Sequence, residues 1–228
     1  MRLSRIYTTA IIIIPTLFSC KNNNYRNLYE GEIYYNIDYI KSQGSLSLDF
    51  KPKSLVVSFK TDKLLFEILS PVGKQGIINV VNPEKGIYDT YVNMLGTKLY
   101  YEGSANEIHP GFSAMVGVKI RKTSRTMEIC GFECRHAEAV FPFDTNKVYD
   151  IWYTNEIKVK DSNISTPFYE IDGVLMSFYY IMGGSELKFE AEAVYKKEIP
   201  DKAFERRTKY KLIEKKDMDK IITDMVNL

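Results

Sequence analysis

The sequence is poor in the residues on which common catalytic and metal sites depend. It contains two histidines, three cysteines and one tryptophan among 228 residues. It also lacks the Gly-x-Ser-x-Gly nucleophile elbow and the His-Glu-x-x-His zinc motif. These absences argue against the serine-hydrolase and zinc-protease classes. We therefore expect a protein that is not an enzyme and that has no metal site and no cofactor.

A surplus of positive charge is absent as well. The chain carries 31 Lys and Arg against 29 Asp and Glu, and removing residues 1–19, which include Arg2 and Arg5, leaves 29 against 29. Proteins that bind nucleic acid need a basic footprint. The even balance, without a block of basic residues, therefore predicts that nucleic acid is not a partner.

The N-terminal residues have a basic start and an apolar run too short to span a membrane. Two arginines precede the apolar residues 11–14, whereas a spanning helix needs roughly 20 apolar residues. This arrangement is typical of a secretory signal peptide. The run from Leu17 to Cys20 resembles the lipobox of bacterial lipoproteins, and the resemblance implies cleavage before Cys20 and acylation of this residue. The alternative is an ordinary secretion signal in which Cys20 is incidental.

These features divide the chain into three segments. Residues 1–19 are predicted to be the signal peptide, residues 20–28 the lipidated Cys20 with a polar tether, and residues 29–228 one folded domain. Buried acyl chains contribute about 0.8 kcal/mol for each methylene, so two or three chains anchor a protein stably to a membrane. Lys21 follows Cys20, and resemblance to enterobacterial lipoproteins then implies the outer membrane of the cell envelope. Because no acidic cluster follows, we expect the domain to face the periplasm.

The folded domain has the pattern of a mainly β protein. Apolar and polar side chains alternate over residues 29–39, which predicts a half-buried strand. Turn residues separate further short apolar runs, as in antiparallel sandwiches and barrels. The runs predicted to be strands are residues 46–50, 55–60, 64–69, 77–81, 87–92, 123–130, 133–141, 147–154, 174–181 and 186–196.

Two regions depart from this pattern. Residues 95–122 are rich in glycine and are predicted to be loops, with a short helix near residues 112–116. At the C-terminal end, four apolar residues at helical spacing predict an amphipathic helix, with Asp217 as a candidate N-cap. The four are Met218, Ile221, Ile222 and Met225.

The second half of the chain holds four runs that carry a family resemblance. They are residues 129–137 (ICGFECRHA), 148–154 (VYDIWYT), 171–175 (IDGVL) and 199–204 (IPDKAF). In this order they resemble Bacteroidetes lipoproteins of the uncharacterised DUF4412 and GLPGLI-like groups, which look related to the LolA/LolB/LppX superfamily. The third run departs from the GLPGL sequence that names the GLPGLI group.

The resemblance implies a mainly β (α+β) fold, an open antiparallel half-barrel curled around short helices with a C-terminal amphipathic helix. In LolA-like relatives the concave face holds acyl chains. We therefore expect an apolar ligand or lipoprotein acyl chains in the cavity; the alternative is a filled barrel that serves as a structural or protein-interaction module. The candidate lining residues are Tyr35, Phe59, Phe66, Trp152 and Phe178.

Cys130 and Cys134 offer the remaining candidate chemistry. If residues 131–133 form a hairpin loop, the two cysteines face each other across it, close enough for a disulfide. Two part-buried thiols are the alternative. A metal site that includes His136 lacks a fourth ligand. An enzyme would need His109 or His136 beside a carboxylate and a nucleophile.

Overall fold

One curved sheet forms most of the molecule. The computed structural model describes residues 27–43, 51–71 and 75–227, and within these ranges twelve strands lie in the order β12-β6-β5-β4-β3-β2-β1-β11-β10-β9-β8-β7. All neighbouring strands are antiparallel except β12 and β6. The strands are β1 (Glu30–Lys41), β2 (Ser54–Lys60), β3 (Lys63–Leu69), β4 (Gly76–Asn82), β5 (Ile87–Met94), β6 (Thr97–Glu102), β7 (Lys119–Ile129), β8 (Phe132–Phe141), β9 (Asp144–Thr154), β10 (Val174–Met182), β11 (Ser185–Lys196) and β12 (Lys211–Leu212).

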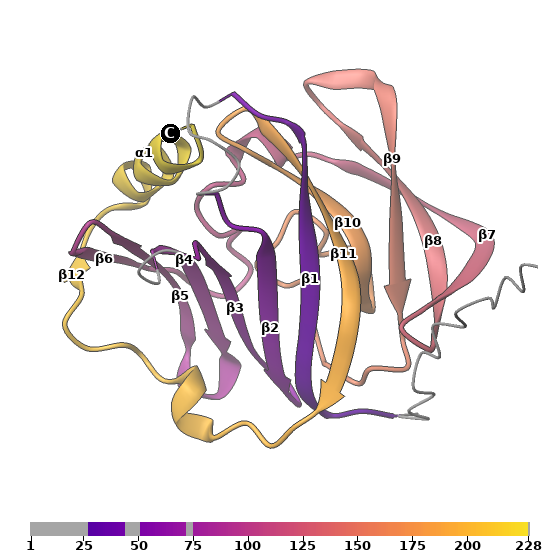
Figure 1. Cartoon of the computed structure of the whole chain (residues 1–228), viewed down its shortest axis with the longest axis horizontal. Helices are drawn as coiled ribbons and strands as arrows, with labels where there is room; N and C mark the ends of the chain where they lie inside the picture. The colour runs from indigo at the N-terminus through magenta and orange to yellow at the C-terminus, as the bar shows by residue number, and fades with distance from the viewer. Residues whose placement is uncertain (1–26, 44–50, 72–74, 228) are drawn as a thin grey trace, which may run out of the picture.

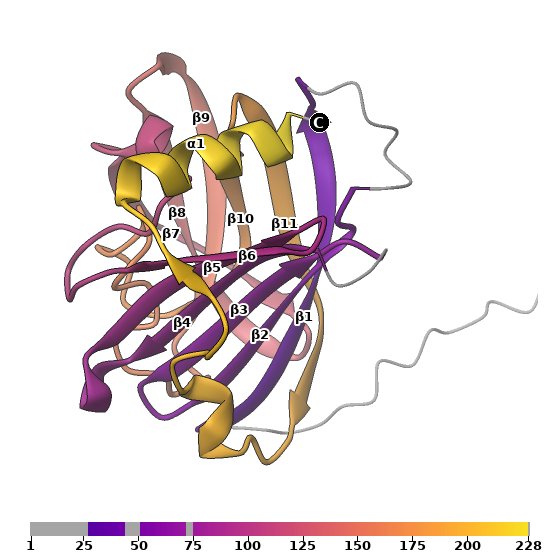
Figure 2. The same cartoon turned by 90° about the vertical axis from the view of Figure 1, so that its left-hand side faces the viewer.

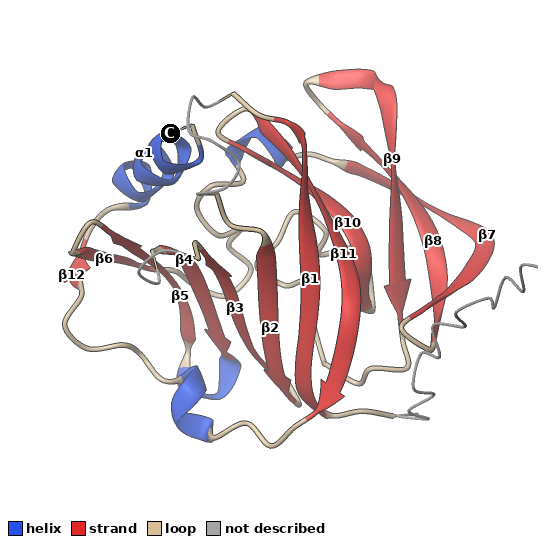
Figure 3. Cartoon of the chain, in the orientation of Figure 1, coloured by secondary structure: helices blue, strands red, loops and turns tan. Residues whose placement is uncertain are grey.

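The sheet curls into an open half-barrel whose two edge strands, β12 and β7, lie apart (Figures 1 and 3). Helix α1 (Lys215–Val226) lies across one end of the half-barrel. The interior is occupied by residues 103–118 and 155–173, which form turns and the short 3-10 helix η2 (Ser113–Met115). The predicted mainly β half-barrel with a C-terminal helix is therefore confirmed. No helix in the described ranges is both long and apolar enough to cross a membrane.

Strands β3 to β5 pack against other residues on both faces. All seven residues of β4 are buried. Ile77 packs into the main core on the inner face, whereas Ile78 and Val80 pack into a second core on the outer face. Ile199 and Phe204, which follow β11, complete the second core. A strand buried on both faces needs a continuous apolar run, which explains the weak alternation of β4.

The outer core is covered by residues 197–214, which we call the strap. The strap contains the 3-10 helix η3 (Asp201–Phe204), crosses the outer face of the sheet and leads into α1 (Figure 2). Arg206 donates from Nε to Oδ2 of the fully buried Asp89 at 2.8 Å, and the Tyr91 hydroxyl donates to the same oxygen at 2.7 Å. Because a buried carboxylate is costly without such donors, this group fixes the strap in place.

The predicted apolar stripe of the C-terminal helix packs against the core, but the predicted N-cap is wrong. Helix α1 begins at Lys215 with Glu214 at the N-cap position, and Asp217 lies in the first turn. The backbone N–H of Ile213 donates to the carbonyl of Tyr100 on β6 at 2.9 Å. The chain is thus held to the sheet until residue 213 and becomes helical directly afterwards.

The loop prediction for residues 95–122 is partly wrong. The region contains β6 and the start of β7, although η2 confirms the short helix. Strand β6 was missed because its side chains are half-buried or exposed near the edge of the sheet, where alternation is weak. The strand predicted over residues 46–50 lies outside the described residues, as do residues 1–26 with Cys20.

Candidate functional site

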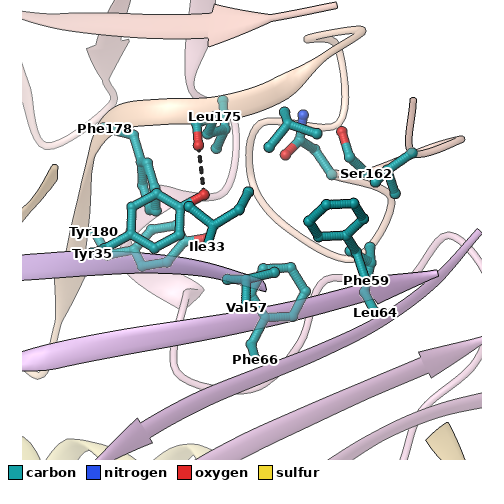
Figure 4. A pocket seen from close by; sticks show the side chains of 13 residues that line it. Ile33, Tyr35, Val57, Phe59, Leu64, Phe66, Ser162, Leu175, Phe178 and Tyr180 are labelled. Atoms are coloured by element: carbon teal, nitrogen blue, oxygen red, sulfur yellow. Dashed lines mark hydrogen bonds between the residues drawn. The ribbon is translucent and has the colours of Figure 1, made fainter. Parts of the chain in front are cut away.

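Four of the five aromatic residues predicted to line a cavity meet on the inner face of the sheet. Tyr35, Phe59, Phe66 and Phe178 line one cavity, which we call the central pocket (Figure 4). Its volume is only about 20 Å³, which is room for about one water molecule. The Tyr35 hydroxyl donates to the carbonyl of Leu175 at 2.8 Å and closes one side. The central pocket is therefore packed and does not hold a ligand in this conformation.

Trp152, the fifth predicted residue, lines none of the four cavities found among the described residues. Its ring lies 4.6 Å from the ring of His136, which is opposite it in the β8–β9 register, and 5.2 Å from the guanidinium of Arg125. Successive strand residues point to opposite faces. Because Ile151 and Tyr153 occupy the core, Trp152 faces away from the interior.

His136 takes part in a polar network that joins three strands. Its Nε2 lies 2.6 Å from Oδ1 of Asp150, and its Nδ1 lies 2.8 Å from Oγ1 of Thr123. Because an ionised carboxylate only accepts, His136 donates from Nε2 to Asp150. The imidazole thus meets the carboxylate and the hydroxyl that an enzyme would need. The network joins β7, β8 and β9, and its three residues line none of the four cavities described in this section.

His109 is buried in the interior. Its Nδ1 lies 3.1 Å from the hydroxyl of Thr90, and burial lowers its pKa to about 3, so the ring is neutral at physiological pH. Its Nε2 and the side-chain oxygen of Asn79 have no hydrogen-bond partner among the described residues. Both residues line a cavity of about 20 Å³. A single buried water would satisfy these two atoms.

The predicted loop of residues 131–133 is wrong, and of the two alternatives for Cys130 and Cys134 the structure has the two thiols. Strand pairing places Ile129 opposite Phe132, so the turn consists of Cys130 and Gly131, and Cys134 lies opposite Met127. Both cysteines are thiols, without a disulfide in the described ranges. The Cys130 thiol donates to the carbonyl of Ala191 at 3.2 Å, whereas burial raises the pKa of Cys134 to about 12. An inert buried thiol of this kind has a packing role.

The described residues include no group of three His, Cys, Asp or Glu arranged to hold a metal ion. An open groove of about 720 Å³ with a mixed polar and apolar lining lies among the interior residues 106–108 and 161–172, and its walls include Asp161, Glu170 and Asp172. These acidic residues are spread along the groove. They form no metal centre.

A mostly apolar cavity, larger than the central pocket, lies between the inner face of the sheet and the end of α1, and we call it the α1 cavity. Its volume is about 130 Å³. In another protein, a cavity of about 150 Å³ with a lining of Leu, Ile and Phe side chains binds benzene. The lining residues are Ile37, Tyr39, Lys51, Pro52, Ile68, Ser70, Gln75, Gly76, Ile77, Met94, Met182, Leu187, Phe189, Met225 and Val226.

The α1 cavity combines an adaptable apolar wall with polar groups. Three of its residues are methionines, which fill irregular spaces and adapt to a ligand. Lys51, Ser70 and Gln75 provide the polar groups. Lys51 is only 4% exposed, although it carries a charge. Sequence reasoning missed this site, because the alternation of Ile37 and Tyr39 in β1 continues unchanged past the packed pocket.

The cavities form a line along the inner face. The small cavity beside His109 shares Phe66 and Tyr180 with the central pocket, and it shares Ile77 and Met182 with the α1 cavity. Side chains, and not the backbone of the sheet, therefore divide the interior. Movement of Ile77 or Met182 would extend the α1 cavity into the small cavity beside His109, and movement of Phe66 or Tyr180 would then extend that space into the central pocket.

Known structures match the fold. Two crystal forms of PNGF-II match with TM-scores of 0.54 and 0.51, identities of 17% and 18%, and coverage of 85% and 86% of this chain. The matched regions are 33% and 32% of those chains, so this protein spans about one third of the length of PNGF-II. At this identity the match concerns the fold alone.

Two weaker structural similarities involve smaller proteins. Lipoprotein LppX of Mycobacterium tuberculosis matches with a TM-score of 0.34 and 11% identity over 76% of this chain and 89% of LppX. A LolA superfamily protein from Nitrosomonas europaea matches with a TM-score of 0.32 and 11% identity over 79% of this chain and 91% of that protein. Scores of this size carry no argument about a ligand. No protein-family model and no curated protein matches the sequence, so membership of the DUF4412 group stays a prediction.

Proposed function

We propose that this chain is a non-enzymatic lipoprotein of the cell envelope that holds an apolar group, such as the end of an acyl chain, in the α1 cavity. The observation that carries the proposal is the α1 cavity itself, about 130 Å³ of mostly apolar space between the inner face of the sheet and the end of α1. Binding sites for whole small molecules measure roughly 300–1,000 Å³. The α1 cavity therefore suits part of a molecule, with the remainder outside.

The position of the N-terminal end of the domain supports an anchor on the side of the half-barrel opposite the α1 cavity. Strand β1 begins at the end of the half-barrel opposite α1 (Figures 1 and 2). A lipid on Cys20 would hold that end near the outer membrane, and the α1 cavity would then face the periplasm. Loss of acyl-chain labelling and of membrane association in Cys20→Ala tests the anchor. Retention of both would contradict it.

A second function, that of a structural or protein-interaction module, is favoured by the packed central pocket. There the ring of Phe178 lies 5.6 Å from Tyr35, 4.9 Å from Tyr180 and 5.0 Å from Phe189, and no acyl chain fits between them. This function requires that the α1 cavity stay empty in the cell.

Photolabelling distinguishes the two functions. Membranes from cells that produce the full-length chain are incubated with an octanol analogue that carries a diazirine near the end of its tail, and then irradiated. The proposal predicts label on Met182 or Met225, which line the α1 cavity. Met225→Trp should remove the label by filling the cavity, whereas Asp224→Trp, on the exposed side of the same helix, should retain it. Label scattered over the surface, unchanged by Met225→Trp, would favour the interaction module.

A further inference from the structure

The α1 cavity contains a buried cation, and we propose that Lys51 makes the cavity selective for single-chain amphiphiles with an anionic head group. This inference rests on the proposed function, because it names the class of molecule that the same cavity takes. The tail would occupy the apolar part, and a carboxylate or phosphate would meet the Lys51 ammonium.

Lys51 is unusually buried for a lysine, because it is only 4% exposed. The ammonium has three N–H donors and needs acceptors when it is removed from water. Nζ donates to the hydroxyl of Ser42 at 2.8 Å and to the carbonyl of Val226 at 3.4 Å. It also lies 5.6 Å from the centre of the Tyr39 ring. All three neighbours are electrically neutral, so they solvate the ammonium without cancelling its charge.

The lining of the α1 cavity is mostly apolar. Among the described residues of the α1 cavity, Lys51 alone is charged at neutral pH, and neither Asp nor Glu contributes to the walls. Ser70 and Gln75 add neutral polar groups. The remaining lining is almost entirely apolar, from Ile37 and Ile68 on the sheet to Met225 on α1. A single positive charge at an apolar cavity is complementary to an anionic head group on an apolar tail.

The volume sets the length of the tail. A cavity of about 130 Å³ is close to the roughly 150 Å³ that holds the six carbons of benzene in another protein. We therefore expect affinity to rise with chain length up to about six carbons in the cavity and then to level off. Longer chains would gain further affinity only if Ile77 or Met182 moved and joined the α1 cavity to the small cavity beside His109.

The alternative is that Lys51 only stabilises the C-terminal end of α1. Its bond to the carbonyl of Val226 is typical of a lysine at a helix C-terminus. Both roles are compatible, so the experiment must measure a preference for charge and not only a loss of binding.

Membranes that contain the full-length chain are incubated with a diazirine-bearing octanoate, and unlabelled octanoate, octyl phosphate and octanol compete for the site. Octanoate and octyl phosphate should compete at concentrations about tenfold to a hundredfold lower than octanol, the factor expected for one hydrogen bond to a charged group. The relative strength of the two anions identifies the head group as carboxylate or phosphate. Lys51→Met should abolish the preference over octanol, and Lys51→Arg should retain it.

The controls separate the two proposals. Lys220→Met removes an exposed charge from α1 and should change nothing. If Lys51→Met still takes up the uncharged octanol probe, its cavity is intact. Equal competition by octanol and octanoate, or an unchanged preference in Lys51→Met, would overturn the head-group inference and leave the apolar site. Absence of label from the α1 cavity with both charged and uncharged probes would overturn the proposed function as well.

Discussion

The two ends of the half-barrel interior are built from the same strands but are filled to different degrees. Along β1, Ile33 and Tyr35 face the central pocket of about 20 Å³, whereas Ile37 and Tyr39 face the α1 cavity of about 130 Å³. At the packed end, Val159 from the interior residues 155–173 lies against the inner face of the sheet. At the other end, one helix covers the opening. The difference shows that the inner face of a single sheet can be packed as core at one end and leave a cavity at the other.

The largest expected effect comes from removing an aromatic ring at the packed end. Phe178 is 2% exposed and contacts four aromatic rings, and Phe178→Ala should lower the free energy of unfolding. We expect a loss of about 3–5 kcal/mol, the usual cost of a large truncation in a packed core. Urea unfolding measures it. Met225→Ala at the hollow end should cost less than half as much, and equal losses would mean that the two ends are equally well packed.

Enlarging a side chain should cost stability at the packed end and little stability at the end that holds the α1 cavity. Val57→Phe, in the wall of the central pocket, should cost about 1–3 kcal/mol because the pocket has no room for the added atoms. Ile77→Phe, in the wall of the α1 cavity, should leave stability nearly unchanged because the ring enters an existing space. Both residues are 4% exposed, which makes them a matched pair. Urea midpoints that shift equally would contradict the contrast.

Acid should loosen the α1 end while the packed end keeps its structure. Lys215, at the start of α1, donates to Oε1 of Glu107 at 2.8 Å and to the carbonyl of Ile108 at 2.9 Å. Burial by itself would raise the pKa of Glu107, but hydrogen bonds from Lys215, Tyr101 and Ser104 lower it to about 2, from an ordinary value of 4.5. A lowered pKa in the folded state stabilises the fold above pH 4.5, and this stabilisation is lost as the pH falls toward 2.

Hydrogen exchange tests this order. After correction for the intrinsic rate, amides of α1 should exchange faster as the pH falls from 4.5 toward 2, before those of β10. Glu107→Gln should remove most of this pH dependence. Simultaneous loss of protection in α1 and β10 would show that the two ends unfold together.

The sheet could be predicted well from the sequence, because alternation and turn residues are local signals. The cavities could not be predicted. Tyr35, Phe59, Phe66 and Phe178 line one pocket, but its volume depends on residues 155–173, which are distant in sequence and fold back onto the sheet.

Three consecutive apolar residues also left the face of Trp152 undetermined. In the run from Ile151 to Tyr153, only strand pairing decides which residues face the core. Lys51 carried no signal, since most lysines lie on the surface. Long-range packing therefore decided each result that the sequence did not predict.

The smallest effect is expected at the turn between β7 and β8, which touches neither cavity. Cys130 and Gly131 both have positive φ, at 52° and 81°, as a two-residue type I′ turn requires. Asn adopts this conformation more readily than Cys, so Cys130→Asn should raise the free energy of unfolding by roughly half a kcal/mol. The lost thiol bond to Ala191 is weak and offsets little of the gain. Cys130→Ala, which loses the bond without improving the turn, is the control. If urea unfolding shows both variants to be destabilised alike, the thiol contact with Ala191 outweighs the gain in the turn.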